Sequence, residues 1–125
     1  MIKTLASVVV LLLAVTVQAQ SALKPPTETA LDRFLRYAKI DTQSQEDQTT
    51  TPSTRKQLNL ANLLAKELTA LGAQNVRVSE FGIVYALVPG NLPDNSKVPV
   101  IGFISHMDTS PAVSGENVNP IIHKN

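Results

Sequence analysis

The first regular pattern of apolar and polar positions lies in residues 28–40. Apolar side chains recur there with i, i+3, i+4, i+7 spacing, at Leu31, Phe34, Leu35 and Ala38. This spacing predicts an amphipathic helix, with Thr27 as its N-cap. Residues 41–52 contain no aliphatic or aromatic side chain, so we expect them to form a solvated loop of a length that is often functional or mobile.

A second helical pattern follows in residues 54–71. Leucines line one face of this segment, at positions 60, 63, 64, 68 and 71. Thr54 and Gln57 have the spacing of a capping box, and Gly72 is a typical residue just beyond a helix end. The pattern therefore predicts a helix that begins near Thr54 and stops at Gly72.

Shorter apolar segments come after the second helix. Residues 75–80 alternate valines with polar side chains, and Phe81-Gly82 can form a tight turn into the apolar residues 83–88, as expected for two strands. Residues 98–105 are almost entirely apolar, which is typical of a central strand buried on both faces. The predicted order is helix, helix, strand, strand, strand, an α/β arrangement that is not closed.

The first nineteen residues have the features of a cleavable signal peptide. Lys3 gives a positive charge, residues 5–17 are mostly apolar, and small residues occupy positions 17 and 19. The alternative is an uncleaved membrane anchor, but the apolar run is shorter than the ~20 residues that span a bilayer. We therefore expect residues 20–27 to be a linker, residues 28–125 to form the folded part, and the protein to be exported to the periplasm or secreted.

Composition and charge exclude several classes of function. The chain has no cysteine, which excludes a disulfide scaffold, a thiolate zinc site and a cysteine nucleophile. The formal net charge is only +1 with dispersed charges, so a nucleic acid is not an expected partner. With the leader removed, we expect no stable membrane association.

Chemistry is most plausible where the predicted buried strand ends. His106 and Asp108 are two residues apart, so in extended chain both point to the same side, beyond the strand's carboxyl end. A histidine can bind a metal through one ring nitrogen while a carboxylate accepts a hydrogen bond from the other. A lone His-x-Asp is common, however, and two ligands cannot hold a catalytic zinc. The only other histidine, His123, we interpret as a surface residue.

The residues around this pair resemble a known family. Residues 102–111 read GFISHMDTSP and residues 114–120 read SGENVNP. Asp-Thr-Gln-Ser at 41–44 and Pro-Ser-Thr at 52–54 occur in the same order and at similar spacing. Together these motifs resemble the N-terminal part of the peptidase T branch, the tripeptide aminopeptidases, of the M20 metallopeptidase family.

The resemblance implies a zinc-dependent exopeptidase that releases the N-terminal residue from short peptides. By similarity, His106 would bind one of two zinc ions and Asp108 would be the catalytic aspartate that holds the imidazole in place. The implied fold is the N-terminal part of a zinc-peptidase α/β/α sandwich, with a smaller domain used in homodimer formation. The remaining metal ligands and the general base would follow Asn125, so we expect this fragment to be inactive alone.

Two alternatives stay open at this point. The chain could be part of another M20 hydrolase, such as a dipeptidase, a carboxypeptidase or an N-acyl amino acid deacylase. It could also be a non-catalytic exported binding module in which the His106–Asp108 pair is structural. The resemblance places the loop at 41–51 near the mouth of the site, but we interpret its individual carboxylates, Asp41 among them, as parts of a solvated connector.

Overall fold

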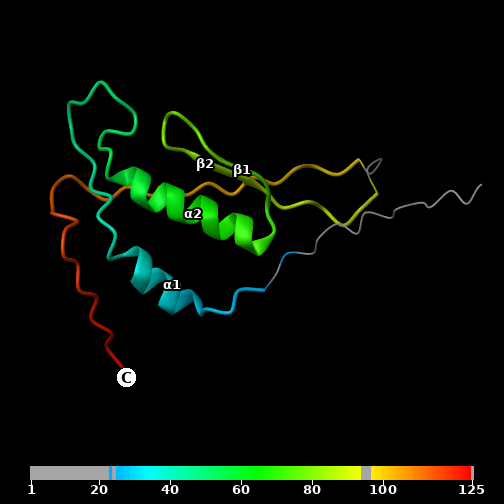
Figure 1. Ribbon diagram of the computed structural model, residues 1–125, viewed down its shortest axis with the longest axis horizontal. Helices are drawn as coiled ribbons and strands as arrows, with labels where there is room; N and C mark the ends of the chain where they lie inside the picture. Colours follow the sequence, from blue (N-terminus) through cyan, green and yellow to red (C-terminus); the bar gives the residue numbers. More distant parts are fainter. Residues whose placement is uncertain (1–22, 24, 94–96, 125) are drawn as a thin grey trace, which may run out of the picture.

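The computed structural model describes residues 23, 25–93 and 97–124, so the predicted signal peptide (1–19) and the start of the predicted linker lie outside the described residues. Four elements follow in the order α1 (Ala30–Tyr37), α2 (Gln57–Leu71), β1 (Gln74–Val78) and β2 (Val84–Leu87). Helix α2 packs on both strands, and α1 lies beside α2 (Figure 1). Within the described residues, no helix is long and apolar enough to cross a membrane.

Helix α1 forms as predicted, but it begins and ends inside the predicted range. Thr29, and not Thr27, is the N-cap: its Oγ1 accepts the Asp32 N–H at 3.1 Å and donates to the Asp32 carboxylate at 2.6 Å. A hydroxyl that bonds the third helical residue satisfies one of the free N–H groups of the first turn. This local bond starts the helix two residues later than the apolar spacing indicated.

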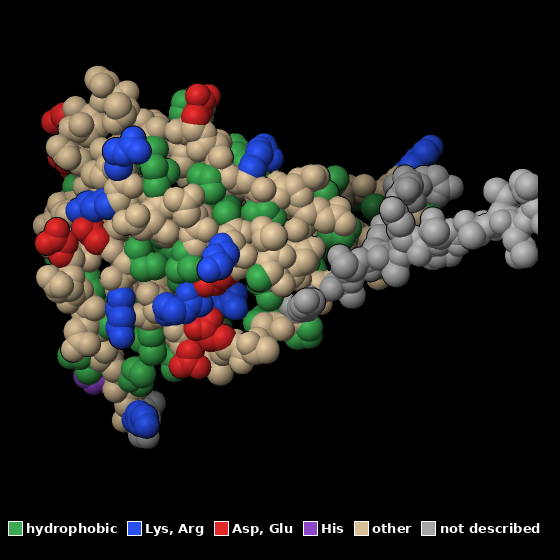
Figure 2. All heavy atoms as spheres, viewed as in Figure 1, with side chains coloured by type: hydrophobic (Ala, Val, Ile, Leu, Met, Phe, Trp, Pro, Cys, Tyr) green, Lys and Arg blue, Asp and Glu red, His purple; other side chains and the backbone are tan. Residues whose placement is uncertain are grey.

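Charged side chains connect α1 to α2. Arg36 lies 2.6 Å from Glu67 through Nη1 and 2.6 Å from Glu28 through Nη2, and Arg33 bonds Glu28 at 3.3 Å. The Tyr37 hydroxyl also donates to Glu67. These groups form part of the mixed basic and acidic cluster between the two helices in Figure 2. The contact between α1 and α2 is therefore largely an ion-pair network.

The same network shifts the titration of both carboxylates. The hydrogen bond from Arg36 lowers the pKa of Glu28 below its ordinary value of 4.5. Partial burial alone would raise the pKa of Glu67, but hydrogen bonds from Arg36 and Tyr37 outweigh burial and lower it. Burial and the bond to Glu67 raise the pKa of the Tyr37 hydroxyl.

These directions predict how the stability of the helix pair depends on pH. A carboxyl group with a lowered pKa in the folded state stabilises that state above its unfolded pKa, and this contribution is lost as pH falls through the folded value. We expect the free energy of unfolding to be flat from pH 7 to about 5, and to decrease below pH 4.5. Tyrosine fluorescence during acid titration measures this. Glu67→Gln should flatten the profile, and an unchanged slope in that variant would contradict the assignment.

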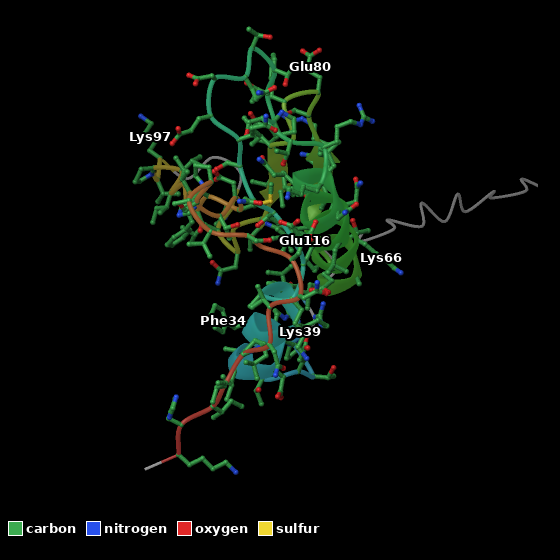
Figure 3. The ribbon with its side chains drawn as sticks, turned by 90° about the vertical axis from the view of Figure 1, so that its left-hand side faces the viewer. Phe34, Lys39, Lys66, Glu80, Lys97 and Glu116 are labelled. Carbon is green, nitrogen blue, oxygen red and sulfur yellow. The ribbon has the colours of Figure 1, made fainter. Side chains whose placement is uncertain are left out.

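The apolar stripe of α1 is only partly covered. Leu35 and Ala38 are half-buried, whereas Leu31 is 52% exposed and Phe34 is 65% exposed. Figure 3 shows Phe34 projecting from α1 on the side away from α2. The helix thus turns its charged side toward α2, which the spacing of its apolar residues did not indicate.

Helix α2 carries the small buried core and ends where the sequence predicted. Leu60 and Ala61 are buried. Gly72 adopts the left-handed region at φ 94°, and its N–H bonds the Thr69 carbonyl at 3.0 Å, a position that favours glycine. The predicted capping box is wrong, because the Thr54 hydroxyl donates to the Gln43 carbonyl at 2.7 Å and the helix begins at Gln57.

The two predicted strands after α2 form an antiparallel hairpin. Val78 pairs with Val84 and Arg77 with Tyr85, with an irregularity toward Gln74. Gly82 supplies the turn at φ 76°, in the left-handed region that glycine adopts without strain. A Cβ on Gly82 would lie 3.2 Å from Pro52 and 3.3 Å from Leu58, so the turn also packs closely on the start of α2.

The prediction of a buried central strand at 98–105 is not confirmed among the described residues. This segment is extended but has no strand assignment and no backbone hydrogen bond within the described part of the chain. Phe103 is 97% exposed and Ile104 is 100% exposed. A strand exists only where a neighbour accepts and donates its ladder bonds, and the hairpin does not pair with it. The part of the chain that the structure describes is thus an α/β fragment with two helices and two antiparallel strands, and a third strand and the sandwich stay predictions.

Candidate functional site

The two residues singled out by the sequence contact each other. His106 Nδ1 lies 2.9 Å from the backbone oxygen of Asp108 and 3.3 Å from its Oδ1. The side chain of His106 is 84% exposed and that of Asp108 is 45% exposed. The chain between them is extended, so the two side chains share one side, as the spacing predicted. Their catalytic and metal-binding roles stay predictions.

The contacts of His106 Nδ1 favour one tautomer of the neutral imidazole. Both atoms near Nδ1 are oxygens that can only accept, so a neutral imidazole must donate from Nδ1. The lone pair is then on Nε2, which has no hydrogen bond within the described residues. A histidine held in this way is suited to donate that lone pair to a metal ion.

The pair lies on the edge of an open hollow of about 940 Å³. Its walls come from α2, from the turn of the hairpin and from the segment that carries the pair, and its apolar lining includes Leu60, Leu64, Phe81 and Ile83. Residues 50–53, of which Thr50, Thr51 and Ser53 are polar, also line the hollow. A polar pair beside an apolar concave surface is the usual arrangement of a small-molecule or peptide site.

The described residues do not complete a metal site. No group of three or more His, Asp or Glu side chains among them could hold a metal ion. His123 is exposed, as its surface interpretation predicted. Since catalytic zinc takes about three protein ligands and an open position, His106 can supply only one part of such a site.

The loop after α1 contacts the chain just beyond the pair. Ser44 N–H bonds the Thr109 carbonyl at 2.9 Å, and Thr109 N–H bonds the Thr42 carbonyl at 3.1 Å, forming a parallel bridge between Gln43 and Thr109. The Gln43 amide also donates to the Pro111 carbonyl at 3.0 Å. The polar composition of the loop gave no signal for this contact.

Asp41 organises the loop from within. Its Oδ1 accepts the Gln43 N–H at 2.9 Å and its Oδ2 accepts from Lys56 at 2.7 Å. The bond from Lys56 and then that from Gln43 lower the pKa of Asp41. The interpretation of Asp41 as a solvated carboxylate is therefore wrong, whereas Glu46 and Asp47 are exposed as expected.

Gly115 closes the other side of Asp41. Its backbone is buried against the carboxylate, and a Cβ at this position would overlap Asp41 Oδ1. Only a residue without a side chain can bring the backbone so close. The loop, the start of α2 and the segment after the pair are thus held together at one place.

Curated proteins named peptidase T are similar to this chain. The protein from Clostridium acetobutylicum is 52% identical over 98 residues, which cover 78% of this chain and 24% of that protein. The protein from Listeria innocua is 49% identical over 98 residues, covering 78% and 23%. The protein from Desulfitobacterium hafniense is 54% identical over 97 residues, again covering 78% and 23%.

Two further facts define the extent of this similarity. No protein-family model matches the chain. The chain spans about a quarter of the length of the curated relatives it matches. Over nearly four fifths of its own length, the chain is similar to peptidase T.

Proposed function

We propose that this chain forms part of a zinc-dependent exopeptidase that releases the N-terminal residue from short peptides, with tripeptides as the favoured substrates. The observation that carries the proposal is the contact between His106 Nδ1 and Asp108 in a chain about half identical to peptidase T. The relatives' name supports peptide hydrolysis, and the pair supports a metal-dependent reaction.

In this proposal each residue of the pair has a distinct task. His106 would bind zinc through Nε2, and Asp108 would keep the imidazole in the required tautomer and orientation. When bound, the metal would polarise the peptide carbonyl and acidify a water molecule. The other ligands and the general base would come from the part of the relatives' length that this chain does not span.

The surroundings of the pair support a peptide as substrate. The hollow beside it has room for several side chains and is lined on one side by apolar residues of α2 and the hairpin turn. An apolar wall can bury a substrate side chain while the polar edge meets the peptide backbone. We also propose that residues 98–105 form an inner strand of a larger α/β/α domain, and that residues 1–19 direct export.

A chimera tests the activity directly. Residues 28–125 of this chain would replace the corresponding stretch of the Clostridium acetobutylicum peptidase T, which is 52% identical to it. We expect the chimera to release the N-terminal residue from a tripeptide, to lose this activity on chelation, and to regain it when zinc is restored.

Two substrates separate this proposal from its alternatives. An N-acylated tripeptide should resist cleavage, because the proposed aminopeptidase needs a free amine. Faster cleavage of the acylated substrate would favour another M20 hydrolase. A folded chimera that binds tripeptides without cleaving them would favour a binding module, and activity that survives chelation would contradict the zinc-dependent mechanism.

A further inference from the structure

The segment that follows Asp108 has no regular structure of its own. Residues 109–124 lie outside every helix and strand, and Thr109 forms only an isolated bridge. Residues 98–105, on the other side of the pair, are extended and exposed. Within the described residues neither side belongs to a sheet or a helix, so the contacts made just after Asp108 bear directly on where its carboxylate points.

The loop after α1 supplies this support. Figure 1 shows the loop and the segment after residue 105 meeting at one end of the molecule. Three bonds converge on Thr109: its N–H donates to Thr42, and its carbonyl accepts from the N–H and the hydroxyl of Ser44 at 2.9 and 2.8 Å. Thr42 is only 2% exposed, so this side of the bridge is firmly packed.

Gln43 extends the support to the next turn. Its Nε2 donates to the Pro111 carbonyl at 3.0 Å, and its Oε1 accepts from Lys56 Nζ at 3.2 Å. Lys56 in turn bonds Asp41 at 2.7 Å. These contacts orient the Gln43 side-chain amide. Lys56 can only donate, so it faces the amide oxygen, and the NH₂ group is left facing Pro111. Lys56 selects the amide rotamer that holds Pro111.

We propose that Gln43 is a positioning residue for the His106–Asp108 pair. The Gln43 side chain holds Pro111, and the backbone of the residues on either side of Gln43 holds Thr109. These contacts fix the chain directly after Asp108 and keep the carboxylate on the imidazole. The effect on catalysis rests on the proposed peptidase function, whereas the effect on residues 109–112 does not. Gln43 itself touches neither member of the pair.

Two substitutions separate the donor role of Gln43 from its packing. Gln43→Met keeps the length of the side chain but removes both polar atoms. Gln43→Glu keeps the acceptor for Lys56 but removes the donor to Pro111. Gln45→Met is the matched control in the same loop. The Gln45 side-chain amide makes no hydrogen bond within the described part of the chain, and its backbone N–H, which donates to Ser53 Oγ, is kept in the variant.

The first measurement is hydrogen–deuterium exchange in the full 125-residue chain at low micromolar concentration. We expect both Gln43 variants to speed exchange of the Thr109 amide by about tenfold, because the bridge opens more often once Pro111 is released. Gln45→Met should leave exchange unchanged. Unchanged exchange in both Gln43 variants would overturn the proposal.

The second measurement is kinetic and uses the chimera described above. Loss of partners that orient a metal ligand typically costs 10–100-fold in metal affinity or activity, and Gln43 acts from one step further away. We therefore expect kcat and zinc affinity to fall about tenfold in both Gln43 variants, with KM unchanged. A lower Tm with normal kcat and zinc affinity would show a merely structural role and overturn the proposal. A chimera that hydrolyses no tripeptide refutes the proposed function instead, and exchange and zinc affinity then decide the role of Gln43.

Discussion

Replacing His106 by alanine is expected to lower kcat/KM for tripeptide hydrolysis by roughly 1,000-fold in the chimera, because a catalytic metal ion supplies several kcal/mol of transition-state stabilisation. In the proposed arrangement the exposed His106 side chain binds the metal through Nε2, because Nδ1 faces Asp108. Zinc content per protein chain, measured beside the kinetics, should fall in the same variant.

His123→Ala is the matched control for this prediction. His123 is the second of two histidines and is exposed near the end of the described residues, so its loss should leave both kcat/KM and zinc content unchanged. Asp108→Asn should cost about 10–100-fold, as for other groups that orient a metal-bound histidine. Full activity in His106→Ala would contradict the assignment of the site, whatever the chimera does with other substrates.

The second large effect concerns the chain by itself. Residues 98–105 expose apolar side chains on both faces, and their backbone groups make no hydrogen bond to other described residues. The most exposed side chains are those of Val100, Ile101, Phe103 and Ile104. An extended apolar segment with an open edge is a template for pairing with another chain. We expect the isolated 125-residue chain to self-associate at concentrations on the order of 10 µM and above.

Sedimentation velocity over a range of concentrations measures this association. Ile101→Lys should keep the chain monomeric to at least about tenfold higher concentration, because a charge at the centre of the segment disfavours edge pairing. Leu92→Lys is the matched control: Leu92 is also apolar and 55% exposed, but it lies before the segment. A monomeric chain with a cooperative thermal transition would contradict this prediction.

Local patterns predicted the elements and the end of α2, but not where the helices begin or what they contact. The helix at 57–71 and its stop at Gly72 follow from the leucine spacing and from the left-handed conformation that glycine allows. The hairpin follows from alternation on both sides of Phe81-Gly82. Thr54 was predicted as a cap, but its hydroxyl bonds Gln43, eleven residues earlier in the chain. A hydroxyl that is suited to cap a helix can instead donate to any carbonyl that the fold brings near.

Burial was the least predictable property. The apolar run at 98–105 has the composition of an inner strand, but composition only states what a segment can bury, and burial needs neighbours on both faces. Within the described residues these neighbours are absent and the segment stays exposed. Similarly, α1 contacts α2 through the ion pair of Arg36 with Glu67. The apolar stripe of α1 is short, and half of it stays exposed.

The sequence by itself determined the helices, the hairpin and the side of the chain that His106 and Asp108 share, because each depends on residues close together in the chain. A spacing of two in extended backbone directs both side chains to one side of the chain. Only the tertiary structure decided which residues hold that pair in place. Gln43 and Pro111 are 68 residues apart, and no local pattern encodes a hydrogen bond over that separation. Folding alone brings the loop to the site, where Asp41 contacts Lys56 and Gly115 while Gln43 faces Pro111.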